Sequence, residues 1–438
     1  MNANYDLLME PQKLNKMRVL ENSESYISTR QDIWSVITIF WLLLSPLIGY
    51  LAGTVWKLRG SIVIAWGIAI IALISSLLKI SHLKLSRYFL FASIYYLAII
   101  LIPALSGSNF RVKFNNEALL CIFLLIAANS YISAKVYNQA LKWMAALIVV
   151  SLVVIIIQQF YNPLFLVSKN VSEEFEWDKF SNFQYRLHSI WSYVSDTASG
   201  FSLMAPYAVL LGYMIEKKKN GWWIALLCAA VLLYSVLTRQ RYLIIVYLII
   251  TFQIYRLLNR AVNQIAVLVV LFLCIGLLLY SGFPLFDLIQ YRYLDVQAGG
   301  IAYGSFSART QSWEAFKRFF SSSWLLGIDM SKQASDYYNY LGRETGQNLL
   351  GIIYPFITYG IIGSIWYYLL LYFLLRDSYI IGRKTKNYGF FVLFIAFIAT
   401  GFANGSPLSD GGIMLAIMFM KYYRDNIPAR QPQIQVQI

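Results

Sequence analysis

The stretch WMAALIVVSLVVIIIQQF, from Trp143 to Phe160, is almost entirely apolar and contains no charged side chain. A helix needs about 20 residues to cross the hydrocarbon core of a bilayer, so this run predicts a membrane-spanning helix with a small contribution from its flanks. Soluble domains carry about 25% charged residues, whereas this chain of 438 residues has 13% charged and 59% hydrophobic residues. The composition therefore indicates a protein that lives in lipid.

Further uncharged apolar runs lie on both sides of this stretch. They occur at about 34–52, 61–78, 88–105, 118–134, 198–214, 222–237, 242–255, 264–281, 349–375, 388–403 and 411–420. The shorter runs must extend into their flanks to span a bilayer, notably 242–255 and the last run. We expect an all-α polytopic membrane protein of about twelve transmembrane helices over residues 34–423, between a polar N-terminal segment 1–33 and a tail 424–438.

The distribution of charge predicts the orientation of these helices. The segments on the same side as the N-terminus are 1–33, 79–87, 135–142, 215–221, 252–263, 376–387 and 421–438. They hold 21 of the 36 Lys and Arg residues and 8 of the 21 Asp and Glu residues, a net charge of +13, which leaves +2 for the rest. Basic loops favour the cytoplasm, so both termini are expected there. The overall charge of +15 then requires no nucleic-acid partner.

Two segments on the opposite side, 161–197 and 282–348, are too long to be simple connectors. We interpret them as two large periplasmic loops. The second contains SARTQSWEAFKRFF at 307–320, which would place Trp313, Phe316 and Phe320 on one helical face and its charged residues elsewhere. This pattern predicts a short amphipathic helix at the outer boundary of the membrane.

Four arginines, Arg186, Arg239, Arg241 and Arg309, are expected on this outer side. A guanidinium can hold a phosphate through two parallel hydrogen bonds, and the phosphate nearest a membrane belongs to a lipid head group. The alternative is that Arg239 and Arg241, at the end of a short apolar run, only extend to the interface without a further role. Their proximity to two large loops favours an anionic, lipid-linked substrate.

Other polar and aromatic side chains in the two loops are candidates for binding a glycan. They are Asp196 in the first loop, and Trp313, Tyr337, Glu344, Gln347 and Asn348 in the second; His188 in the first loop could act as a base near neutral pH. Aromatic faces stack on sugar rings, whereas amides and carboxylates bind hydroxyl groups. Structural alternatives are a helix cap for Asp196, packing for His188 and an interfacial aromatic belt for some tyrosines.

The sequence offers little for a metal or an ion-coupled transport mechanism. Cys121, Cys228 and Cys274 lie inside apolar runs without metal-ligand spacing, and the chain has only two histidines. We interpret the cysteines as small packing residues and expect no metal and no cofactor. The absence of charge within the apolar runs argues against a proton- or sodium-coupled transporter.

Four local patterns occur in order along residues 183–375. They are Arg186 before Ser195-Asp196, the turn Thr238-Arg239-Gln240-Arg241, the pair Arg309 and Trp313, and the pair Gln347-Asn348 followed by an apolar run with Gly360 and Gly363. In these patterns and their expected topology, the chain resembles the bacterial O-antigen ligase and polymerase superfamily, which includes Wzy-type polysaccharide polymerases and WaaL-type ligases.

The resemblance implies a metal-independent glycosyltransferase of the bacterial inner membrane. It would transfer a glycan from a polyprenyl diphosphate onto a carrier-linked repeat unit, with a flippase and a chain-length regulator as candidate partners. Arg241 and Arg309 are expected to stabilise the departing diphosphate, with Arg186 and Arg239 in support, and Glu344 is the first candidate for the base.

Ligases of the superfamily carry a histidine at the end of the large loop, where this chain has Gln347. Since a neutral amide cannot accept a proton, the sequence favours a polymerase. A ligase acting on a lipid or a protein remains the alternative within the class. A flippase for lipid-linked oligosaccharides is the alternative from another class.

Overall fold

The structure is a computed structural model of the whole chain, and it describes a large part of it in detail. The described residues are 33, 35–44, 47–48, 51, 54–55, 67, 70–71, 74, 86–105, 116–129, 132–166, 187, 198–238, 244, 247–252, 255, 261–280, 301–320, 324–328, 336–337, 339–340, 352–385, 387–401 and 411–426.

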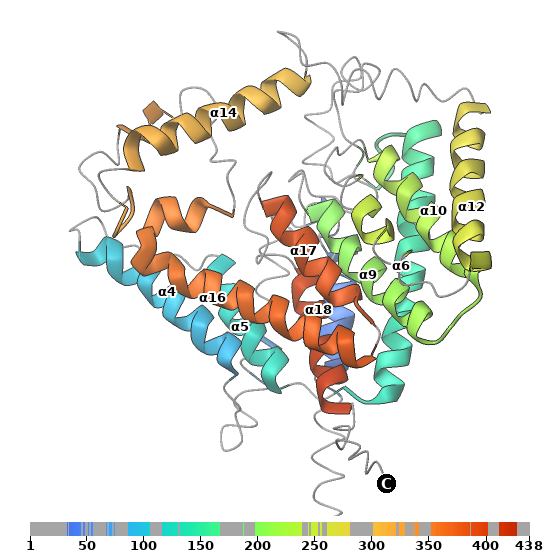
Figure 1. The fold of residues 1–438 in the computed structure, drawn as a ribbon, viewed down its shortest axis with the longest axis horizontal. Helices are drawn as coiled ribbons and strands as arrows, with labels where there is room; N and C mark the ends of the chain where they lie inside the picture. Colours follow the sequence, from blue (N-terminus) through green and yellow to red (C-terminus); the bar gives the residue numbers. More distant parts are fainter. Residues whose placement is uncertain are drawn as a thin grey trace, which may run out of the picture.

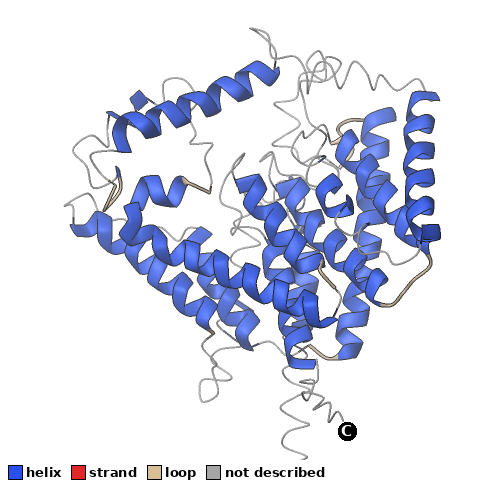
Figure 2. Ribbon diagram, in the orientation of Figure 1, coloured by secondary structure: helices blue, strands red, loops and turns tan. Residues whose placement is uncertain are grey.

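These residues form mainly helices (Figure 1). The helices are α4 (Arg87–Leu105), α5 (Asn116–Asn129), α6 (Ala134–Phe160), α9 (Ala198–Glu216), α10 (Gly221–Leu237), α12 (Ala261–Tyr280), α14 (Ile301–Phe320), α16 (Tyr354–Thr385), α17 (Gly389–Gly401) and α18 (Gly411–Asn426). No strand occurs among the described residues (Figure 2), so the all-α prediction is confirmed for them.

Two helices, α6 and α16, are long and apolar enough to cross a membrane, as judged by length and composition. α6 contains the Trp143–Phe160 stretch. Its buried side includes Met144 and Ile148, while Val149 on another side is 60% exposed. A helix that is apolar on both its packed and its exposed faces suits a lipid environment. Five other described helices are apolar but shorter, so the number of spans stays a prediction.

Two helix boundaries differ from those expected from the apolar runs. The run 118–134 is not one helix, because α5 ends at Asn129 and α6 begins after Ser133. The Ser133 hydroxyl caps α6 by accepting a hydrogen bond from the Val136 N–H, 3.3 Å away, which favours a new helix start there. α16 continues through the expected connector 376–387 as far as Thr385. Basic residues in a last helical turn are compatible with the helix dipole, so the charge does not end the helix.

α4 and α16 pack along an aromatic seam. Phe91 of α4 stacks on Phe373 of α16, with ring centroids 5.3 Å apart and planes 6° apart. The ring of Tyr95, one turn further along α4, has its centroid 5.3 Å from that of Tyr367 of α16. Because Phe91 and Tyr95 lie one turn apart on the same face of α4, these contacts hold the two helices side by side.

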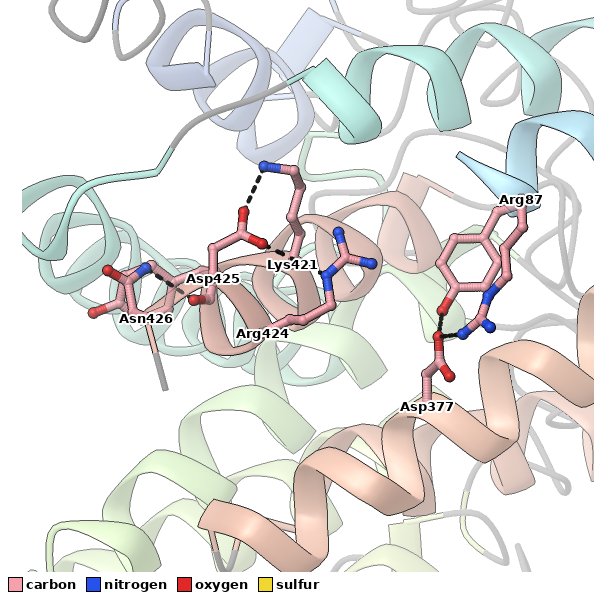
Figure 3. A network of polar contacts seen from close by, with 8 residues as sticks. Arg87, Asp377, Lys421, Arg424, Asp425 and Asn426 are labelled. Carbon is pink, nitrogen blue, oxygen red and sulfur yellow. Dashed lines mark hydrogen bonds and ion pairs between the residues drawn. The ribbon is translucent and has the colours of Figure 1, made fainter. Parts of the chain in front are cut away.

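One end of this seam is closed by a polar contact (Figure 3). The Asp377 carboxylate of α16 accepts hydrogen bonds from Arg87 and from the Tyr88 hydroxyl at the start of α4. The Arg87 guanidinium also lies over the Phe373 ring, 4.8 Å from its centroid. The start of α4 is thereby fixed against the last third of α16.

A second polar contact joins four further chain segments near the same end of α16. We call Tyr137, Glu216, Asn387 and Tyr423 the tyrosine cluster. The Tyr423 hydroxyl donates to Glu216 at 2.6 Å, pairs with the Tyr137 hydroxyl at 2.8 Å and accepts from the Asn387 amide at 3.1 Å. The start of α6, the end of α9, the turn between α16 and α17 and the end of α18 therefore meet at one end of the bundle.

The segments joined by these contacts all belong to the side that carries most of the basic residues in the sequence. Arg87, Tyr137 and Glu216 come from three different segments, and Asp377 and Asn387 come from a fourth, all of which the charge pattern placed together. The structure brings these segments to one end of the helices, which is what a shared membrane face requires.

Candidate functional site

Three described helices, α9, α10 and α16, border the candidate residues with the ends that lie away from the tyrosine cluster. α9 leads away from the tyrosine cluster to its start at Ala198. α10 begins just after the turn that follows Glu216, so its last residue, Leu237, lies about 25 Å away along its 17 residues. The start of α16 is likewise remote from Asn387. We call this end of the bundle, with the start of α9, the end of α10 and the start of α16, the far end.

Sequence continuity connects the far end to the predicted site. Asp196 precedes α9, Arg239 and Arg241 follow α10, and Gln347 and Asn348 precede α16. Four sequence patterns that are distant along the chain are thus bordered by helix ends that lie away from the tyrosine cluster or, for the pattern in α14, lie in a helix that packs against the start of α16.

Most of the predicted site residues lie outside the described residues. They are Arg186, His188, Asp196, Arg239, Arg241, Glu344, Gln347 and Asn348. Arg309 lies in α14, one helical turn before Trp313. The side chains of Trp313 and Tyr337 are described, and they have different surroundings.

α14 lies on the side of the molecule where α4 and the first part of α16 lie, at a large angle to α6 and α12 (Figure 1). It begins at Ile301, earlier than the expected helix at 307–320. The stripe that packs against the protein is Ser312, Ala315 and Phe319, whereas Trp313 and Phe316 of the predicted apolar face lie on another side of the helix. These three residues follow helical spacing, and the small side chains of Ser312 and Ala315 allow α14 to approach the protein closely. Trp313 lies beside the stripe and is 40% exposed.

The inner face of α14 packs on a small hydrophobic cluster. The cluster contains Ala315, Phe319, Ile328, Tyr337 and Ile357, and it is separate from the main core. The rings of Phe319 and Tyr337 meet edge to face, with centroids 5.7 Å apart. Tyr337 was predicted to bind a glycan, but its side chain is 1% exposed and packs beneath α14. In this structure Tyr337 supports the helix.

The outer side of α14 combines aromatic and basic groups. The ring centroids of Trp313 and Phe316 lie 5.2 Å apart, and the Lys317 ammonium lies 5.8 Å from the centre of the Trp313 ring. The Arg318 guanidinium lies over the rings of Phe319 and Tyr340. Indole rings and cations together suit the boundary between lipid and water, and they can also contact a sugar and an anionic group.

An apolar groove of about 270 Å³ lies along the first half of α16, where Gly360 interrupts the helix. Its lining residues are Phe356, Ile361, Ser364, Ile365, Tyr368 and Leu369. The Ser364 hydroxyl donates to the Gly360 carbonyl at 2.6 Å, and the Tyr368 hydroxyl donates to the Ile352 carbonyl at 2.9 Å. Both hydroxyls are satisfied within the protein, so the groove offers an apolar surface.

Sequence reasoning missed both this groove and the tyrosine cluster. Gly360 in the Gly-x-x-Gly pattern was the available signal for the groove. Among the residues that the structure describes, no three His, Cys, Asp or Glu side chains are grouped so as to hold a metal ion. Cys121 and Cys228 are buried free thiols, in agreement with a packing role.

No known family model matches the chain, and no curated protein matches its sequence. The assignment of a function therefore depends on the local sequence patterns and on the arrangement of the helices.

Proposed function

We propose that the protein is an inner-membrane polysaccharide polymerase. It transfers a glycan from a polyprenyl-diphosphate carrier onto a carrier-linked repeat unit in the synthesis of O-antigen, capsule or exopolysaccharide. Both termini are cytoplasmic and the reaction takes place at the far end, on the periplasmic side.

The observation that carries this proposal is the arrangement of the far end. The start of α9, the end of α10 and the start of α16, which border Asp196, Arg239, Arg241 and Gln347, all lie away from the basic side of the bundle, and α14, which contains Arg309, packs against the start of α16. A transferase acting on a lipid diphosphate needs cations and hydroxyl-binding groups at the same membrane boundary. A flippase needs such charges in a cavity that opens to both sides.

The proposed reaction is a displacement at the anomeric carbon of the donor. The acceptor hydroxyl oxygen forms the new glycosidic bond while the bond from the anomeric carbon to the diphosphate oxygen breaks. The electron pair leaves with the diphosphate, where Arg241 and Arg309 stabilise the developing charge, assisted by Arg186 and Arg239. Glu344 accepts the proton of the acceptor hydroxyl.

The rest of the site has binding roles in this proposal. Trp313 stacks on a sugar, while Gln347, Asn348 and Asp196 bind hydroxyl groups. The apolar groove along α16 is suited to the isoprenoid chain of the carrier. It begins at Phe356, next to Ile357 of the hydrophobic cluster on which α14 packs. Gln347 in place of a histidine favours a polymerase over a ligase.

Deletion of the gene in its host, followed by gel analysis of the surface glycan, tests the proposal. Loss of polymerisation leaves glycan with a single repeat unit, and a plasmid copy restores the polymer. Accumulated carrier-linked polymer would instead identify a ligase. Loss of all surface glycan with carrier-linked repeat units facing the cytoplasm would identify a flippase.

A further inference from the structure

The break in α16 at Gly360 is completed by another part of the chain. Gly360 has φ 63° and ψ −168°, which no helix accommodates. Such a break removes acceptors from the N–H groups of the following turn. Here the Ile361 N–H donates to the Trp324 carbonyl at 3.1 Å, and the Ile362 N–H donates to the Leu325 carbonyl at 3.2 Å. The segment Trp324–Ile328, which we call the brace, supplies the missing acceptors.

The brace and α16 cross backbone against backbone, and two glycines permit it. A Cβ added to Gly360 would lie 2.3 Å from the Leu325 carbonyl oxygen and 2.5 Å from the Gly327 nitrogen. A Cβ added to Gly327 would lie 2.1 Å from the Thr358 carbonyl oxygen. Both glycines also have positive φ, at 85° for Gly327 and 63° for Gly360. A side chain at either position therefore forces the two backbones apart.

The brace also contacts α14. Its last residue, Ile328, is fully buried and belongs to the cluster with Ala315 and Phe319 of α14 and Ile357 of α16. One short segment thus joins the inner face of α14 to the break in α16. The crossing therefore lies beside the buried face of α14.

We propose that the crossing of Gly327 and Gly360 is a positioning device, through which α16 fixes α14 and thereby places Arg309 and Trp313 in the site. The role of α14 in the reaction rests on the proposed function, whereas the positioning does not. The glycines act through α14 and touch no reacting group.

Spin-label distances test the positioning directly. Labels are attached to cysteines at Lys317 of α14 and Lys384 of α16, both exposed, in a full-length protein whose native cysteines are replaced. We expect one narrow distance distribution in the parent protein and a shifted or broadened one in Gly360→Ala and Gly327→Ala. Gly276→Ala is the matched control, since a Cβ there meets nothing within 4 Å. An unchanged distribution in both folded variants would overturn the proposal.

Activity separates this inference from the proposed function. If the distances change and the surface polymer shortens or disappears, the device and the role of α14 are both supported. A change in distance with normal polymer would keep the device and remove α14 from the reaction.

If neither glycine variant folds, hydrogen exchange in the parent protein decides. The Ile361 and Ile362 amides should be protected as strongly as those in the middle of α16. Exchange as fast as that of an open loop would rule out the brace.

Discussion

At the scale of single residues, the proposed chemistry depends on arginine geometry rather than on positive charge alone. Guanidinium is planar and can donate two parallel hydrogen bonds to a phosphate, whereas an ammonium is a point charge on a flexible stem. α14 also carries Lys317 and Arg318, whose side chains contact aromatic rings. Because arginine and lysine have the same charge, replacing arginine by lysine separates bidentate phosphate binding from a general electrostatic effect.

We expect Arg241→Lys and Arg309→Lys to lose most polymerase activity while the protein remains folded and inserted. Removal of one transition-state donor typically lowers kcat by about 10²–10³-fold, and lysine retains only the charge. Arg383→Lys, an exposed change at the basic end of α16, is the control and should be silent. The measurement is polymer formation from a lipid-linked repeat unit. Wild-type rates in both site variants would show that bidentate recognition is not used.

The base is tested at Glu344 and Gln347. Glu344→Gln preserves shape and hydrogen bonding but cannot accept a proton, so the rate should fall by about 10²–10⁴-fold. Gln347→Ala removes only a hydroxyl-binding amide and should reduce the rate modestly. Single-turnover rates at normal protein levels distinguish the two effects. Full activity in Glu344→Gln would exclude Glu344 and make His188 the next candidate.

At the scale of elements, the ends of helices are held by different means at the two ends of the bundle. The tyrosine cluster joins α6, α9 and α18 through buried hydrogen bonds, and Asn387 is its link to the turn before α17. At the start of α16, backbone hydrogen bonds to the brace and a small hydrophobic cluster hold α16 and α14 together. Buried polar contacts of this kind hold helices at a defined height, because an unpaired partner is costly in a low-dielectric interior.

Asn387→Ala should destabilise the bundle. The Asn387 side chain is buried, donates to Tyr423 and accepts from the Gly389 N–H at 3.1 Å. Leaving buried groups unpaired typically costs about 1–3 kcal/mol. Asn426→Ala is the matched control, because that amide bonds one carbonyl in an exposed position and should change stability by less than about 0.5 kcal/mol. Denaturation in micelles measures both, and equal stabilities of the two variants would refute the linking role.

At the scale of the whole molecule, the charge pattern and the helix arrangement agree on two distinct ends. The contacts of Arg87, Glu216 and Asn387 gather segments that are rich in basic residues. α14 lies away from them, beside the first part of α16 (Figure 1). If the protein spans a membrane, these ends face different compartments.

Cysteine labelling in intact cells tests this orientation. A cysteine at Lys317 should react with a membrane-impermeant reagent added outside the inner membrane. Cysteines at Lys218 and Lys384 should react only after the membrane is opened, because basic segments remain in the cytoplasm. All three positions are exposed, which makes them comparable. The reverse pattern would invert the topology and place α14 away from the proposed substrate.

The helical class of the described region and the positions of most described helices were determined by the sequence alone. An uncharged run as long as Trp143–Phe160 favours a helix, because a helix satisfies its backbone groups within one segment. The grouping of segments such as 79–87 and 376–387 on one side followed from charge, and the contact of Arg87 with Asp377 agrees with it. These properties are local or additive, so they can be read without tertiary contacts.

Only the tertiary structure decided which face of α14 packs against the protein and what role the helix break at Gly360 has. Whether Trp313 or Ala315 faces the rest of the protein depends on the packing surface offered by Tyr337 and Ile357, and the sequence pattern of α14 gave no sign of that surface. The role of Gly360 depends on a partner, Gly327, that is remote along the chain and close only in the folded protein. Helix periodicity reports on one segment at a time, whereas these features require two segments to meet.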